Sequence, residues 1–162
     1  MRTYHAIDVA KRFLELAQSE NMSVSNMKLQ KLVFFSQVVS LKMFNTPIHS
    51  NDSLAWDFGP VVRELYDLVH ALVINRPSRQ ISLSEPDVEK AFADAAKIDD
   101  ATVLGVTRAV WNWFKNWTAM QLSNLTHRPG SPWATVYSEN QYGVIPLELI
   151  REKGFGNGSI GV

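Results

Sequence analysis

The stretch from residue 26 to about residue 44 constrains the fold more than any other part of the sequence. Its apolar residues fall on nearly every side of a helix: Met27, Leu29, Leu32, Val33, Phe34, Phe35, Val38, Val39, Leu41 and Met43. A helix that is hydrophobic almost all round is normally buried, so the sequence predicts a central helix, with Ser25 as its N-cap. Four polar side chains are expected to mark where this helix reaches water: Lys28, Gln30, Lys31 and Lys42.

Helical periodicity and capping residues predict further helices around the central one. They are expected at residues 6–20, 60–74, from 85, from 100, 118–125, from 132 and 146–151. Pro60 suits a helix start, where its missing N–H costs nothing. Two short apolar segments, Leu54–Trp56 and Ile81–Leu83, are candidate strands that are expected to pair with each other.

These patterns predict a mainly α fold, a single compact multi-helix domain with a central buried helix and at most a small β-hairpin or short strand pair. The domain is expected to span residues 1–153. Residues 154–162 hold four of the eight glycines and predict a flexible Gly-rich C-terminal tail.

Composition excludes several classes of protein. The chain of 162 residues has no cysteine, so disulfides, thiolate metal sites and a cysteine nucleophile are excluded, and a cytoplasmic location is expected. Its 16 basic and 16 acidic residues balance, which disfavours binding of nucleic acid through bulk positive charge. No uncharged stretch reaches the roughly 18 apolar residues of a membrane helix, so no membrane association is expected.

Motifs that carry enzyme chemistry are missing from the sequence. The glycine pattern in the tail lacks the strand and helix that a dinucleotide site needs, and there is no Gly-x-Ser-x-Gly elbow. The histidines do not have the spacing of metal ligands: they are His5, His49, His70 and His127. We therefore expect no catalytic residue, no cofactor and no metal, and a protein that is not an enzyme.

Three tryptophans near residue 115 suggest a contact surface. Trp113 and Trp117 share a stripe with valines and are expected in the core, whereas Trp111 points away and is the better exposed anchor. Together with Arg108 and Lys115, exposed tryptophan could also stack single-stranded nucleic acid, which is the less favoured alternative.

Four stretches, in order, resemble one family. The first has a Lys-Leu-Gln-Lys-Leu core at residues 28–32, followed by Phe34-Phe35 and Ser36-Gln37. The second runs from residue 47 through Ala55-Trp56 and Gly59-Pro60-Val61 to Tyr66. The third is Leu122 to His127, and the fourth is Pro132-Trp133. This pattern is similar to that of the Panacea domain, the SocA-like antitoxin domain of bacteria and their phages, which is related to the phage-associated GepA proteins.

The resemblance implies an antitoxin, which binds and neutralises a cognate protein toxin that is typically encoded by an adjacent gene. An alternative within the same class is an adaptor that delivers the toxin to a protease and uses the flexible tail. Motif residues expected to be structural are Leu29, Leu32, Phe35, Trp56, Gly59, Pro60, Tyr66, Pro132 and Trp133. The polar or exposed candidates for a toxin-binding surface are Lys28, Gln30, Lys31, Arg63, Trp111 and His127. For each polar candidate, a satisfied buried hydrogen bond is the alternative role.

Overall fold

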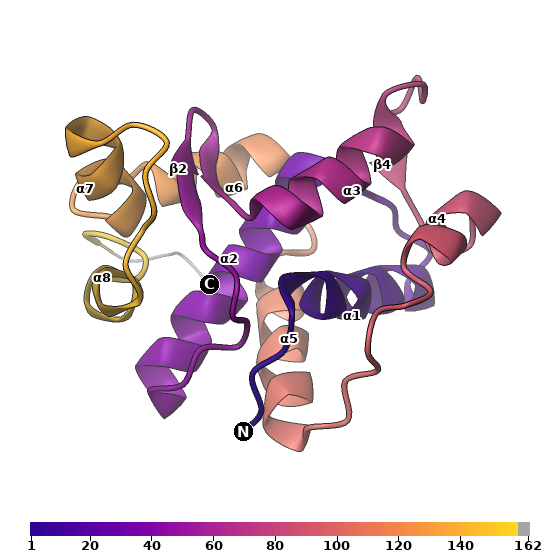
Figure 1. Cartoon of the computed structure of the whole chain (residues 1–162), viewed down its shortest axis with the longest axis horizontal. Helices are drawn as coiled ribbons and strands as arrows, with labels where there is room; N and C mark the ends of the chain where they lie inside the picture. The colour runs from indigo at the N-terminus through magenta and orange to yellow at the C-terminus, as the bar shows by residue number, and fades with distance from the viewer. Residues whose placement is uncertain (159–162) are drawn as a thin grey trace.

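The fold is organised around helix α2 (Asn26–Phe44), which lies at the centre with other helices packed against it (Figure 1). The computed structural model describes residues 1–158. The Ser25 hydroxyl accepts a hydrogen bond from the Lys28 backbone N–H and so caps the start of α2, and Asn45 ends the helix in the left-handed conformation. The predicted central buried helix is confirmed.

The described residues form a mainly α fold with two small two-stranded antiparallel sheets. Both the helical class and the low strand content were predicted from the sequence. In chain order the elements are α1 (Ala6–Ser19), β1 (Val24–Ser25), α2, β2 (Leu54–Trp56), β3 (Gly59–Val61), α3 (Arg63–Val73), β4 (Gln80–Ile81), α4 (Pro86–Ala91), α5 (Ala101–Phe114), α6 (Ala119–Thr126), α7 (Pro132–Glu139) and α8 (Leu147–Lys153). None of these helices is long and apolar enough to cross a membrane.

The strand pairing differs from the prediction. β2 pairs with β3 rather than with β4, because a two-residue turn at positions 57–58 folds the chain straight back on itself. β4 pairs instead with β1. Pro60 therefore lies in a strand opposite Ala55, and α3 begins only at Arg63. The other edge of β2 is also covered, since the Ala55 N–H donates to the Gly143 carbonyl at 2.9 Å.

The tryptophan prediction is wrong for two of the three residues. Trp111 is 1% exposed, whereas Trp113 is 37% exposed. The buried face of α5 runs through Val103 and Thr107, and Trp111 follows them at helical spacing. Trp117 lies beyond the end of α5 and is half-buried, with its ring edge-on to a core phenylalanine.

The first residues of the predicted tail pack against the domain. The Phe155 ring stacks on Phe35 with centroids 5.3 Å apart, and it also lies 6.5 Å from Phe114. The Asn157 N–H donates to the Pro129 carbonyl. These contacts differ from the expectation of a flexible segment, while residues 159–162 of the predicted tail lie outside the described residues. The domain boundary at residue 153 stays a prediction.

Candidate functional site

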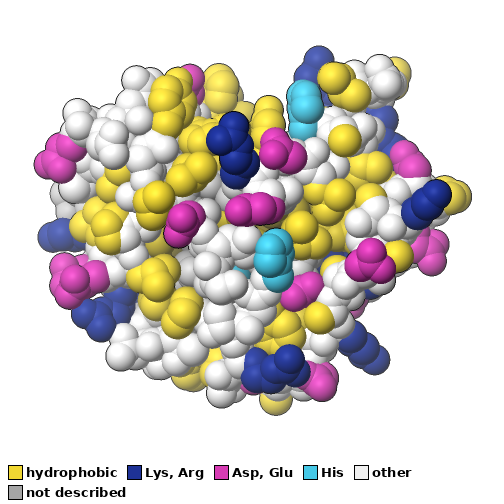
Figure 2. Space-filling view, viewed as in Figure 1, with side chains coloured by type: hydrophobic (Ala, Val, Ile, Leu, Met, Phe, Trp, Pro, Cys, Tyr) yellow, Lys and Arg dark blue, Asp and Glu magenta, His cyan; other side chains and the backbone are white. Residues whose placement is uncertain are grey.

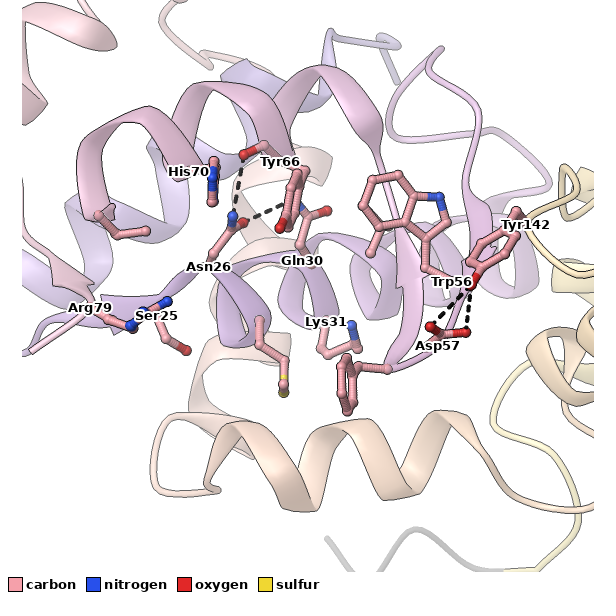
Figure 3. A pocket seen from close by; sticks show the side chains of 14 residues that line it. Ser25, Asn26, Gln30, Lys31, Trp56, Asp57, Tyr66, His70, Arg79 and Tyr142 are labelled. Atoms are coloured by element: carbon pink, nitrogen blue, oxygen red, sulfur yellow. Dashed lines mark hydrogen bonds between the residues drawn. The ribbon is translucent and has the colours of Figure 1, made fainter. Parts of the chain in front are cut away.

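A cleft of about 510 Å³ opens between the start of α2, the β2–β3 hairpin and α3. Figure 3 shows its side chains converging from these three elements, with Arg79 and Tyr142 at opposite ends. The lining residues are Ser25, Asn26, Met27, Gln30, Lys31, Trp56, Asp57, Phe58, Val61, Tyr66, His70, Val73, Arg79 and Tyr142. The cleft therefore gathers residues from the first two sequence motifs.

Lys31 projects from α2 into this cleft (Figure 3). It is 1% exposed, so the prediction that it reaches water is wrong. Its Nζ donates to the Pro60 carbonyl at 3.3 Å, and none of the ion pairs among residues 1–158 includes it. Because burial penalises the charged form, the pKa of Lys31 falls to about 7.

Gly59 allows the hairpin to pass directly over Lys31. Its φ of +114° belongs to the region that favours glycine. A Cβ at this position would lie 2.6 Å from Lys31 Cε and 2.6 Å from Thr126 Oγ1. The Gly-Pro motif therefore has a structural role, because only glycine fits between the lysine stem and α6.

Gln30 is also buried, at 2% exposure, which again differs from the predicted contact with water. Its Oε1 accepts the Val62 N–H at 3.0 Å, and its Nε2 donates to Asn26 Oδ1 at 3.2 Å. Asn26 Nδ2 in turn donates to the Tyr66 carbonyl at 3.3 Å. Gln30 thus has the alternative role anticipated for it, a satisfied hydrogen bond that ties α3 to α2.

Aromatic rings form one wall of the cleft. Trp56 meets Tyr66 edge-on with centroids 5.0 Å apart, and Tyr66 stacks on His70 at 5.5 Å. The exposed Arg63 guanidinium lies 6.0 Å above the Trp56 ring. Trp56 and Tyr66 are half-buried, so their rings shape the cleft and also contribute to its surface.

Asp57 anchors the tip of the hairpin to α7 and to the segment that follows it. Its carboxylate accepts hydrogen bonds from the Tyr137 hydroxyl at 2.7 Å, the Gln141 amide at 3.1 Å and the Tyr142 hydroxyl at 3.0 Å. These bonds hold the pKa of Asp57 below its usual range. Next to it, Phe58 is 60% exposed at the mouth of the cleft.

The third and fourth motifs lie on α6 and α7, which pack against the β2–β3 hairpin. The His127 ring stacks on Trp133 at 3.8 Å, and Trp133 Nε1 donates to the Trp56 carbonyl at 2.7 Å. His127 Nε2 is buried and has no hydrogen-bond partner among the described residues. Burial and, to a lesser degree, the charge of Lys31 lower the pKa of His127.

The structure brings some predicted site residues together and separates others. Gln30 and Lys31 line the cleft, Arg63 lies over the Trp56 ring, and His127 stacks on Trp133. Lys28 lies elsewhere, donating to the Lys115 carbonyl at 2.5 Å with its Nζ 6.0 Å from the Trp111 ring.

Trp111 is not the exposed anchor that was expected. Its indole N–H donates to the Glu20 carboxylate, which also accepts from Lys115 Nζ at 2.7 Å. The residues expected to be structural are buried or half-buried: Leu29, Leu32, Phe35, Trp56, Gly59, Pro60, Tyr66, Pro132 and Trp133.

Sequence reasoning missed Asn26, Asp57, Phe58 and Tyr142. The signal for Asp57 and Phe58 was present, because they fill the two positions between the Ala-Trp and Gly-Pro motifs, as a hairpin turn does. Among the described residues, no three His, Cys, Asp or Glu side chains come together in a way that could hold a metal.

Residues 29–134 match the family model described as antitoxin SocA-like, Panacea domain. The match covers about two thirds of the chain and contains all four sequence motifs, the first of them from Leu29 onward. The chain therefore belongs to the SocA-like antitoxin family with the Panacea domain. Neither the comparison with curated proteins nor the comparison with solved structures finds a match.

Proposed function

We propose that this protein is an antitoxin that neutralises a cognate toxin by binding it directly in the cytoplasm, and that it acts as a binding protein rather than as an enzyme. Membership of the SocA-like antitoxin family supports this function. We further propose that the toxin is encoded by the adjacent gene. Such a protein needs a stable core and a recognition surface, and it needs no catalytic constellation.

The observation that supports a particular surface is the convergence of the first two motifs on one cleft with an exposed aromatic rim. Phe58 is 60% exposed and Tyr142 is 52% exposed, and both line the cleft. Large aromatic side chains at the centre of an interface contribute most of the binding energy. We propose that the toxin covers this rim.

The surface favours a protein partner over nucleic acid. On the face shown in Figure 2, Lys and Arg side chains are interspersed with Asp and Glu, and hydrophobic side chains lie between them. A nucleic-acid surface concentrates positive charge. The burial of Trp111 also removes the stacking anchor of the nucleic-acid alternative.

Co-expression of the protein with the product of the neighbouring gene tests the function. We expect growth to be arrested by the neighbour alone, growth to be rescued by the pair, and the two proteins to co-purify. Arrest without rescue, or rescue without co-purification, would contradict direct neutralisation. A toxin half-life that is shortened by this protein would instead support delivery to a protease.

The surface is tested with two matched variants. Phe58→Ser is expected to weaken toxin binding at least tenfold, as loss of an interface anchor does. Met43→Ser removes a hydrophobic side chain that is 70% exposed near the end of α2, away from the cleft, and is expected to leave binding unchanged. Equal affinities of the two variants would place the interface elsewhere.

A further inference from the structure

We propose that the cleft is a binding site for a singly charged carboxylate carried on an aromatic or branched apolar body, with the carboxylate paired to Lys31 Nζ. The site is defined by the cleft itself. Only its protein-borne form, an acidic side chain of the toxin, rests on the proposed antitoxin function.

The first argument is the unused hydrogen-bonding capacity of Lys31. An ammonium group has three N–H donors, and one of them is directed at the Pro60 carbonyl over a long 3.3 Å. No acidic group among residues 1–158 forms an ion pair with it. Buried lysines are almost always paired. The Lys31 ammonium, at the base of a cleft and with two N–H donors unused, can therefore bind an anion.

The acidic residue that lines the same cleft, Asp57, does not supply that anion. Tyr137, Gln141 and Tyr142 already hold its carboxylate. These hydroxyl and amide donors fix it at the tip of the hairpin, and it forms no ion pair with Lys31 within the described part of the chain. The Lys31 ammonium therefore remains available to a ligand.

The charges that line the cleft favour one negative charge over two. Below the Lys31 pKa of about 7, Lys31 and Arg79 are cationic and Asp57 is anionic, so these three side chains leave one positive charge. A carboxylate balances this charge. A doubly charged phosphate would add repulsion from Asp57, and phosphate sites generally use several donors or an arginine fork, which the base of this cleft lacks.

The remaining walls select the body of the ligand. Trp56, Tyr66 and Phe58 present aromatic surface, and Val61 and Val73 add aliphatic surface. A volume of about 510 Å³ lies within the range of small-ligand sites. A phenyl or branched alkyl group would fill this part while its carboxylate reaches Lys31.

Calorimetric titration of the full-length protein with 3-phenylpropanoate tests the proposal, with 3-phenylpropanamide as the neutral isostere. We expect the acid to bind with a Kd below about 1 mM, in line with the affinity per atom of small ligands, and the amide to bind at least tenfold more weakly. Because both ligands are tested on the unaltered protein, this comparison does not depend on any variant folding.

Two lysine variants locate the binding charge. Lys31→Met is expected to weaken binding of 3-phenylpropanoate at least tenfold, and Lys42→Met, on the exposed end of the same helix, is expected to leave it unchanged. The proposal is overturned if the acid does not bind at 10 mM, if the amide binds equally well, or if a folded Lys31→Met variant retains full affinity.

The pH dependence gives a second readout. The pKa of Lys31 near 7 in the empty cleft means that the pairing ammonium is fully present below that pH. Affinity should therefore fall about tenfold per pH unit above it. The other charged or titratable groups that line the cleft or act on Lys31 are Asp57, Tyr66, His70, Arg79, Tyr142 and His127. Affinity that stays constant from pH 7 to 9 would contradict pairing with Lys31.

The source of the carboxylate is resolved by a capped peptide, acetyl-Phe-Glu-Phe-amide, which has one side-chain carboxylate and no free terminus. Tighter binding of this peptide than of 3-phenylpropanoate assigns the cleft to an acidic segment of a protein partner. Tighter binding of the free acid assigns it to a small molecule. Both results support the carboxylate site, whether or not a toxin is found beside the gene.

Discussion

Two buried polar side chains on α2, Gln37 and Lys31, differ in how completely they are satisfied. Gln37 is 0% exposed, and its Oε1 accepts the backbone N–H groups of Ile48 and His49 at 2.7 and 3.3 Å. Its Nε2 donates to the His49 carbonyl at 3.1 Å. Lys31 is 1% exposed, yet it has one weak acceptor and no counter-charge among the described residues.

The difference separates a structural polar group from one kept for binding. Gln37 uses both ends of its amide to fix the backbone that follows α2, so its hydrogen bonds offset the free-energy cost of burying it. Lys31 has no comparable partners, and desolvating an ammonium costs several kcal/mol unless it is paired. Equal burial therefore has opposite consequences for stability at the two positions.

The largest expected effect is at Gln37. Gln37→Leu keeps the approximate volume but leaves three buried backbone groups unpaired, each costing about 1–3 kcal/mol. We expect the free energy of unfolding in urea to fall by about 4 kcal/mol. Gln18→Leu, at an exposed position on α1, is the control and should change it little. A loss below about 1 kcal/mol at Gln37 would show that this amide is dispensable.

Gly59→Ala should have the next largest effect, a loss of about 3 kcal/mol, because the added Cβ meets the lysine stem and the backbone is in a region unfavourable to alanine. Gly105→Ala is the matched control, since nothing lies within 4 Å of its added Cβ, and it should stabilise α5 by about 0.5–1 kcal/mol.

A double-mutant cycle sharpens this result. Lys31→Ala removes the Cε that the new methyl group would meet, so part of the cost of Gly59→Ala should disappear in that background. Strict additivity of the two changes in thermal or urea unfolding would mean that the glycine does not accommodate the lysine.

Lys31→Met should have the opposite sign to Gln37→Leu. Met has a similar length and no charge to desolvate, so we expect the variant to be more stable than the natural protein by about 2 kcal/mol at pH 7. A clear loss of stability at pH 7 would instead make Lys31 a structural residue like Gln37.

The pH dependence of that gain follows from the lowered pKa of Lys31. The pKa of Lys31 is about 7 in the folded state and 10.5 in the unfolded chain. At pH values between these two, Lys31 is protonated in the unfolded state but largely neutral in the folded state. Stability of the natural protein therefore rises with pH in this window, and the cost is fully present below pH 7. The advantage of Lys31→Met should shrink between pH 7 and pH 9, as measured by urea unfolding at each pH.

The smallest effect concerns the two tryptophans of α5. Trp111→Phe should destabilise the protein by about 1 kcal/mol, because the smaller ring fills less of the core and the Glu20 carboxylate loses the indole N–H donor. Trp113→Phe, at a 37% exposed position, should be neutral. Reversed effects in thermal unfolding would restore the assignment suggested by the sequence.

Local chemistry made much of the fold predictable. The all-round apolar pattern identified α2, and Ser25 caps the start of this helix as expected. Such signals act within one turn of chain. Strand pairing does not, and the association of β4 with β1 rather than β2 depends on how α2 and α3 place the segments.

The site was less predictable, because burial of a polar residue is decided by its neighbours in space. Lysine on a helix normally reaches water, but the hairpin folds over Lys31 and helps to bury it. The error at Trp111 has a similar origin, since the packing of α1 and α2 against α5 decides which face of that helix is buried, and this face includes Trp111 rather than Trp113. The sequence motifs identified the segments that form the cleft, and the structure shows how these segments contact one another.

The contact between Phe35 and Phe155 also bears on how the chain folds during synthesis. The two rings lie 5.3 Å apart but are separated by most of the sequence, and such non-local contacts slow folding. The surface of α2 around Phe35 is not fully covered until residue 155 has left the ribosome. Until then the nascent chain exposes an apolar surface that chaperones recognise and that favours aggregation.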